Sequence, residues 1–292
     1  MNPTVLVLVL CSTFMHAGWN LLARRQRNEM AFFGRMLLVC VVVGLLPAGI
    51  SELLTRSISP RAWACVLGSG ALCGAYYFCL GRAYESSDFT VVYPVARALP
   101  VLLVGAGDVL LGRHPTSVGW LGMVLVVGGC LLTPLRSFKG FALRRYLNRT
   151  SVWILLTAMG TVGYTLLDKL AAEAVKAGPA TAARYGYVFF VVSYLSYTLL
   201  VHGFLRPRPQ PRRTGWLAPA VGVAMNFGAY WLILWAYQMA SRASYVVAFR
   251  QFSIVIGVVL AFAIYKEPGK AVRLTGTGLI LAGLVVIGLW GR

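Results

Sequence analysis

Ten long apolar stretches constrain this chain more than any other feature of its sequence. Each is close to the length of about 20 residues that an α-helix needs to cross the hydrocarbon core of a bilayer. The run at 118–132, VGWLGMVLVVGGCLL, lacks the strict alternation that strands of a membrane barrel require. The sequence therefore predicts an all-α membrane protein with ten transmembrane helices, at residues 4–23, 31–54, 62–81, 89–111, 116–134, 151–171, 183–204, 215–237, 243–265 and 272–290.

Composition excludes two classes of protein. Of the 292 residues, 59% are hydrophobic and 12% are charged, whereas soluble domains carry about 25% charged residues. The net charge of +19 does not indicate a nucleic-acid partner, because the cations lie beside apolar runs, as juxtamembrane charges do. We expect membrane lipid around the chain, in an inner or plasma membrane. The first apolar run is predicted to be an uncleaved span, since no basic segment precedes it and Arg24, Arg25 and Arg27 follow it.

Sequence motifs of catalysis and cofactor binding are absent. The chain has no GxSxG, HExxH or phosphate-loop motif. Its six cysteines lie in apolar runs and form no CxxC pair, so neither a zinc site nor a disulfide framework is predicted. We expect no enzymatic activity, no cofactor and no metal.

The two halves of the sequence resemble each other. A shift of 153 residues superposes six positions, and an internal match of this kind indicates a duplication. The predicted units are a first five-helix repeat at 1–135, a connecting loop at 136–150 and a second five-helix repeat at 151–292. Because five is odd, the second copy begins on the opposite face of the membrane, and such inverted repeats place their substrate site near the midplane between the halves. The superposed pairs are Trp63 and Trp216, Tyr77 and Tyr230, Ala83 and Ala236, Tyr84 and Tyr237, Arg97 and Arg250, and Pro115 and Pro268.

Two arginines lie deep in matched spans. Arg97 and Arg250 belong to the fourth and ninth spans, where an ionisable group costs about 2.5–3.5 kcal/mol and rarely faces lipid. Two interpretations remain open. Each arginine pairs with Asp108, with Asp168 or with backbone carbonyls of a broken helix, or at least one grips an anionic group of a substrate through its fork of donors.

Other polar residues lie near these arginines or in matched positions. Pro94 and Pro100 flank Arg97 and predict a kink that frees carbonyls there. Tyr93 lies one turn before Arg97, and Gln251 follows the second arginine. The remaining candidates, each open to a packing role instead, are His16 as hydrogen bonder or proton relay, its neighbour Trp19, Asn20 as substrate hydrogen bonder, and the mid-span pair Tyr77 and Tyr230 as cavity residues.

Three segments carry a resemblance to a known family. HAGWNLLAR (16–24), AYESSDFTVVYPVAR (83–97) and FRQFSI with YKEP (249–268) resemble the EamA-type drug/metabolite transporter superfamily, over essentially the whole chain. The resemblance implies transport of a small molecule, although the superfamily moves amino acids, sugar phosphates, amines and drugs. The chain departs from it where Arg113 replaces the acid that commonly ends the fourth helix, and where Gln251 replaces a common Glu. The missing carboxylate favours an anionic substrate.

The sequence as a whole predicts a monomeric secondary transporter that works by alternating access on a small organic anion or a zwitterionic metabolite. The alternatives are efflux of amino acids or drugs, and a flippase that recognises a lipid phosphate. The predicted substrate-binding residues are Arg97, Arg250, Asn20, Tyr77, Tyr230, His16, Trp19, Tyr93 and Gln251.

Charge and resemblance disagree about orientation. With a cytoplasmic N-terminus the external connections would hold 16 Lys and Arg residues and the internal ones 8. The positive-inside rule therefore places both termini outside, whereas the superfamily usually has both inside.

Overall fold

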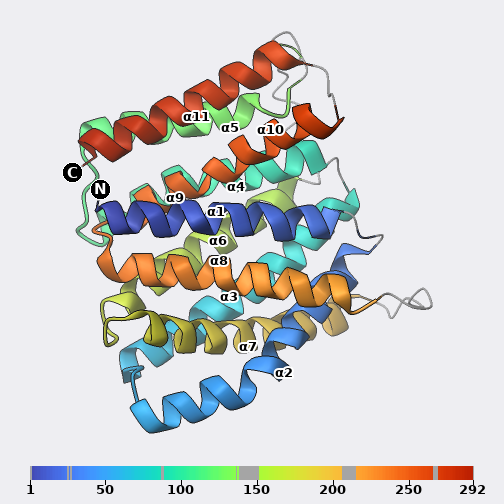
Figure 1. The fold of residues 1–292 in the computed structure, drawn as a ribbon, viewed down its shortest axis with the longest axis vertical. Helices are drawn as coiled ribbons and strands as arrows, with labels where there is room; N and C mark the ends of the chain where they lie inside the picture. Colours follow the sequence, from blue (N-terminus) through green and yellow to red (C-terminus); the bar gives the residue numbers. More distant parts are fainter. Residues whose placement is uncertain are drawn as a thin grey trace.

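The computed structural model describes residues 2–24, 26, 28–86, 89–135, 137, 151–205, 215–265 and 269–291, without the side chains of 24, 85–95 and 260–265. All regular structure in these ranges is helical (Figure 1). The helices are α1 (Pro3–Arg24), α2 (Glu29–Thr55), α3 (Pro60–Ser86), α4 (Phe89–Leu110), α5 (Ser117–Leu132), α6 (Ser151–Ala172), α7 (Pro179–Phe204), α8 (Leu217–Met239), α9 (Ala243–Arg250), α10 (Phe252–Tyr265) and α11 (Lys270–Trp290).

Each of the ten predicted spans contains a helix, and the ninth contains two. Gln251 separates α9 from α10, and its backbone N–H bonds to the carbonyl of Ala248 three residues back, in a tightened turn. The fourth span, where Pro94 and Pro100 predict a kink, is assigned as the single helix α4. At this break the carbonyl oxygen of Arg250 accepts hydrogen bonds from Arg97 Nη2 on α4 and from the Ser253 hydroxyl, each at 2.9 Å.

The lengths and surfaces of the helices suit a bilayer. Within the described ranges, α1, α2, α3, α6, α7, α8 and α11 are long and apolar enough to cross a membrane, and shorter apolar helices lie at Ser117–Leu132 and Ala243–Val259. Large apolar side chains cover the outside of the bundle: Leu53 is 78% exposed and Phe204 76%. Such a surface is stable in lipid, where burying it gains nothing.

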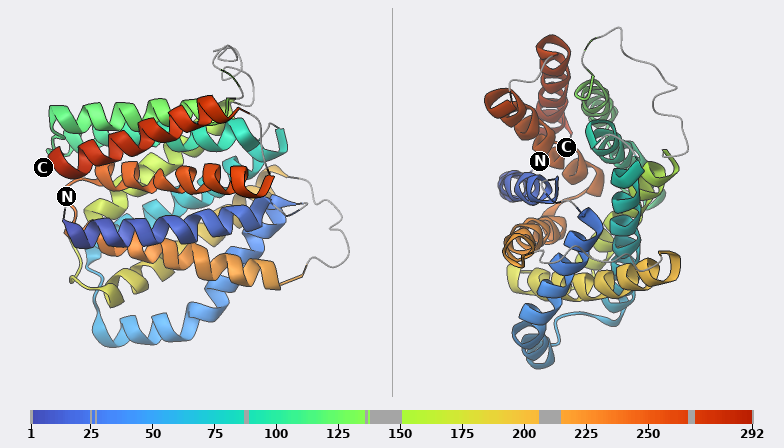
Figure 2. Two further views of the ribbon diagram at one scale, coloured as in Figure 1. Left: turned by 45° about the horizontal axis from the view of Figure 1, so that its top comes forward. Right: turned by 90° about the vertical axis from the view of Figure 1, so that its right-hand side faces the viewer.

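The helices of the two halves interleave. Helix α1 packs along α8, and α6 packs along α3; α4 contacts α9, α2 contacts α7, and α5 lies along α11 (Figures 1 and 2). Both chain termini lie at the same end of the bundle (Figure 1). The turn between α4 and α5 lies at this end as well, because the Thr116 hydroxyl is 3.5 Å from the carbonyl of Trp290.

Glycines allow the closest helix contacts. A Cβ on Gly276 of α11 would lie 2.8 Å from the carbonyl oxygen of Gly129 on α5. On α3, a Cβ on Gly74 would lie 2.6 Å from the carbonyl oxygen of Ser193 on α7. No real Cβ fits at such distances, so any larger residue would force these helices apart. In lipid, close backbone approach supplies the packing that hydrophobicity cannot.

Four charged side chains tie helix ends together near the termini; we call Asp108, Arg113, Lys169 and Glu173 the end cluster. Arg113 Nη2 lies 2.6 Å from Glu173 Oε2, and Lys169 Nζ lies 3.0 Å from Glu173 Oε1. Asp108 accepts the backbone N–H of Ser244 at 2.8 Å, at the positive N-terminus of α9. Burial alone would raise the pKa of Glu173, but hydrogen bonds from Lys169 and Arg113 outweigh it and leave that pKa below its usual value. The end cluster thus joins α4, α6 and α9.

Candidate functional site

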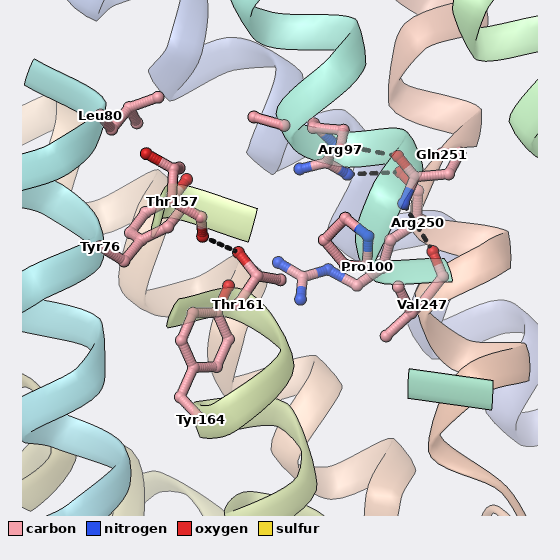
Figure 3. Close-up of a pocket in the computed structure, with 11 residues that line it drawn as sticks. Tyr76, Leu80, Arg97, Pro100, Thr157, Thr161, Tyr164, Val247, Arg250 and Gln251 are labelled. Atoms are coloured by element: carbon pink, nitrogen blue, oxygen red, sulfur yellow. Dashed lines mark hydrogen bonds between the residues drawn. The ribbon is translucent and has the colours of Figure 1, made fainter. Parts of the chain in front are cut away.

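Two small cavities adjoin one another inside the bundle. The first, which we call the arginine cavity, lies between α3, α4, α6 and α9 (Figure 3). The second, the tyrosine cavity, lies between α1, α3, α6, α7, α8 and the end of α9. Tyr76, Tyr164 and Arg250 line both cavities. Their volumes are about 30 and 20 Å³, and one water molecule needs roughly 10–15 Å³ on this measure. A metabolite therefore enters only if the surrounding helices move apart.

Arg97 uses its guanidinium to join three parts of the chain. Its Nε donates to Gln251 Oε1 at 3.1 Å, and its Nη2 donates to the carbonyl oxygen of Arg250 at 2.9 Å. Its Nη1 contacts Nε2 of His16 on α1. Figure 3 shows the two bonds to the α9–α10 junction as dashed lines. Arg97 therefore shares the carbonyl at the helix break with the Ser253 hydroxyl, which donates to it at 2.9 Å. A bond from Arg97 to a backbone carbonyl of a broken helix is one of the two interpretations that the sequence left open.

His16 lies between two hydrogen-bond donors. The indole Nε1 of Trp19 lies 3.1 Å from its Nδ1, and the guanidinium of Arg97 faces its Nε2. A neutral imidazole has a single acceptor nitrogen, so only one of these contacts is a hydrogen bond. An imidazolium would turn N–H groups toward both donors. This environment favours neutral His16 and disfavours the proton-relay hypothesis.

Arg250 lies in a different environment from Arg97. It is 8% exposed, and its guanidinium points into the arginine cavity toward Thr161 and Tyr164 (Figure 3). Its Cζ lies 5.8 Å from the ring centroid of Tyr230, within reach of a cation–π interaction. No described residue accepts a hydrogen bond from its side chain. Arg250 is thus a buried cation whose donors face a cavity.

The two membrane aspartates do not pair with these arginines. Asp168 accepts hydroxyl hydrogen bonds from Tyr185 and Tyr230. Asp108 belongs to the end cluster, with Arg113 Nη1 3.9 Å from its Oδ1. Within the described part of the chain, a pairing of Arg97 or Arg250 with either aspartate is therefore wrong.

Most of the other predicted residues line one of the two cavities. Tyr77 lines the tyrosine cavity and accepts a hydrogen bond from Asn226 at 2.7 Å. Tyr230, His16 and Trp19 line the same cavity, and Gln251 lines the arginine cavity. Asn20 is buried but lines neither cavity; its amide bonds to the carbonyl of His16 at 2.7 Å. The side chain of Tyr93 lies outside the described part of the structure.

Several cavity residues were missed. Thr157, Thr161 and Tyr164 on α6 and Tyr76 on α3 line the arginine cavity. A shift of 145 residues superposes Trp19 on Tyr164. Since Trp19 is a predicted site residue, this match could have identified Tyr164 as a candidate. No sequence pattern identifies the two threonines, because a threonine in an apolar helix usually bonds to a backbone carbonyl of the preceding turn. Thr157 does so with the carbonyl of Trp153 at 2.7 Å.

Comparisons with known proteins agree on the class of fold. The family model described as the EamA-like transporter family matches the chain twice, at residues 3–134 and 148–289. No curated protein matches it. One solved structure, described only as "Crystal structure of protein", superposes with a TM-score of 0.70 over 100% of both chains, at 16% sequence identity. At that identity the likeness shows the fold alone.

Proposed function

The chain belongs to the EamA-like transporter family, as the resemblance predicted, and on that premise we propose that it is a secondary transporter of a small organic anion or a zwitterionic metabolite. Arg250 carries the proposal, because it is a buried guanidinium whose donors face a cavity and find no protein acceptor among the described residues. A cation buried without a partner is costly. A carboxylate or phosphate of a bound solute would supply that partner in bidentate geometry.

The neighbours of Arg250 fit the same substrate. Tyr76, Tyr164 and Thr161 line the arginine cavity with hydroxyl groups, which can donate to further oxygens of an anion. We assign Arg250 to direct contact with the anion and Arg97 to holding the α9–α10 junction. The helices that line the arginine cavity, including the matched helices α4 and α9, all come from one chain. A monomer is therefore enough to form this binding site.

We also propose that the chain works by alternating access between two inverted repeats. The family matches at 3–134 and 148–289 support the division into units at 1–135 and 151–292. The helix contacts support it too, because exchanging each helix with its counterpart in the other half turns the α1–α8 contact into the α6–α3 contact. The α2–α7, α4–α9 and α5–α11 contacts are unchanged by the exchange, as expected for a pseudo-two-fold axis between the halves. The small cavities fit a closed state in which the end cluster holds α4, α6 and α9 together.

A binding screen tests the charge of the substrate. Purified protein is heated with succinate, alanine or tetramethylammonium, since a ligand of the native state raises the unfolding temperature by mass action. We expect stabilisation by succinate or alanine that is lost in Arg250→Ala. Stabilisation by tetramethylammonium alone would contradict the anion assignment.

Counterflow separates soluble-solute transport from the flippase alternative. Liposomes containing the protein are loaded with the stabilising solute and given a radiolabelled trace outside. We expect accumulation of the label in the counterflow assay and no exchange of a fluorescent phospholipid between leaflets. Phospholipid exchange without solute accumulation would contradict the proposed function.

A further inference from the structure

Asp168 is a buried carboxylate that the arginine site does not use. It lies on α6 with no exposed surface, and its Oδ1 accepts a hydrogen bond from the Tyr185 hydroxyl at 2.7 Å. Its Oδ2 accepts from the hydroxyl of Tyr230. Both donors are neutral. The adjacent Lys169 turns to the carbonyl of Tyr237 and to Glu173, each at 3.0 Å.

The helices packed against Asp168 bring few charges to it. Asp108 on α4 is bound to the N-terminus of α9 through the backbone N–H of Ser244 at 2.8 Å. Among the described residues, Arg250 is a cation whose charge acts on Asp168, and the ring of Tyr230, whose hydroxyl bonds to Asp168, lies beside that guanidinium. The titratable groups around the carboxyl are Cys65 and Cys73 on α3, Tyr185 on α7, Tyr230 and Tyr237 on α8, and Arg250 on α9.

We propose that Asp168 is a proton-binding site, and that the proton it carries moves together with the anion bound at Arg250. The pairing with an anion rests on the proposed function, whereas the proton site itself does not. The proton comes from solvent on one side of the membrane, is held on a carboxyl oxygen of Asp168, and returns to solvent on the other side. No other bond forms or breaks.

The hydrogen bonds around Asp168 can satisfy both protonation states. As a carboxylate, Asp168 accepts from Tyr185 and Tyr230. As a neutral acid, it can donate from Oδ1 to the Tyr185 oxygen, provided that Tyr185 finds another acceptor. Ser69 is that acceptor, because its Oγ lies 3.4 Å from the Tyr185 hydroxyl and 3.4 Å from the carbonyl of Val66, to which it donates. Rotation of hydroxyl hydrogens alone therefore accommodates the proton, without an unsatisfied buried group.

Tyr230 connects the proton site with the anion site. Its hydroxyl contacts Asp168, and its ring face lies 5.8 Å from the Cζ of Arg250. An ionised Asp168 offsets part of the positive field at Arg250, and a proton on Asp168 restores it for an anion. Linkage is reciprocal, so bound anion favours the proton as much as the proton favours the anion. Because proton binding and anion binding favour each other, we expect the proton and the anion to cross the membrane in the same direction.

Infrared titration of the protein in liposomes, with no solute added, tests the proton site. Only eight side-chain carboxyl groups are present in the chain, so the C=O band of a single protonated acid can be assigned by mutation. We expect a protonated-carboxyl band whose intensity changes with pH, which is absent in Asp168→Asn and persists in the matched variant Asp108→Asn. Identical difference spectra for wild type and Asp168→Asn would overturn the proposal.

Two further variants keep the test decisive. If Asp168→Asn fails to fold, Tyr185→Phe retains the carboxyl but removes its partner, and we expect the band to shift in frequency; an unshifted band would overturn the assignment. Arg250→Ala tests the coupling. We expect the midpoint pH of the Asp168 band to rise by about 0.7 pH unit or more, which is about a fivefold increase in proton affinity. An unchanged midpoint would overturn the coupling. Counterflow that fails in wild-type liposomes would contradict the transport proposal and leave these spectra to decide the proton site.

Discussion

The two matched arginines should respond to mutation in opposite ways. Arg97→Ala removes donors from Gln251 Oε1 and from the carbonyl oxygen of Arg250, which lie at 3.1 and 2.9 Å. The Ser253 hydroxyl still donates to the Arg250 carbonyl at 2.9 Å, so only Gln251 Oε1 loses its donor. A buried acceptor left without a donor costs about 1–3 kcal/mol, and we expect the unfolding free energy without ligand to fall by about that amount. Arg250→Ala breaks no hydrogen bond to a described residue. It removes a cation–π contact worth about 1–2 kcal/mol together with the cost of burying a charge, so we expect little net change in stability.

Ligand affinity should fall in Arg250→Ala, the variant whose stability is expected to change little. Deleting a charge that pairs with a desolvated ligand costs several kcal/mol, so Arg250→Ala should weaken anion binding by about a hundredfold or more, or about 2.7 kcal/mol. Arg250→Lys keeps the charge but loses the planar fork, and should recover part of the affinity.

Both quantities are measured on each variant by thermal unfolding in detergent, without and with the anion found in the screen. The matched control is Arg61→Ala, which removes an exposed arginine at the start of α3 and should change neither stability nor affinity. The reasoning is refuted if well-folded Arg250→Ala binds the anion as tightly as wild type. It is refuted equally if Arg97→Ala leaves the unliganded protein as stable as wild type.

Three further predictions concern groups around the site. His16→Gln should weaken transport and leave the pH dependence of transport unchanged, because His16 lies between two donors. If the pH profile of counterflow lost an inflection at about pH 6–7, the relay hypothesis would be restored. Since the pKa of Glu173 is lowered in the folded state, the stability it contributes should be complete above its ordinary value of about 4.3 and lost at lower pH. Unfolding temperatures measured across this range should lose that dependence in Glu173→Gln, and an unchanged acid profile would contradict the end cluster. A C-terminal reporter active only in the cytoplasm should stay silent if the positive-inside count holds, and strong activity would reverse the orientation.

The sequence by itself determined the spans and their pairing. A bilayer leaves each backbone polar group to be satisfied inside its own helix, so about 20 apolar residues in a row already specify a spanning helix, whatever surrounds it. The match of Arg97 with Arg250 likewise follows from sequence alone, because a duplication preserves register. These signals are local, and the structure contains a helix in every predicted span.

Only the tertiary structure decided what the matched residues do. The sequence places the two arginines at equivalent positions, but Arg97 bonds to the α9–α10 junction while Arg250 faces the cavity. Asn20 bonds to its own helix, and Asp168 bonds to tyrosines of α7 and α8 instead of an arginine. Hydrogen bonds between helices depend on which side chains the packing brings within about 3 Å of each other. That is set by the rotation and depth of every helix together, and no single stretch of sequence encodes it.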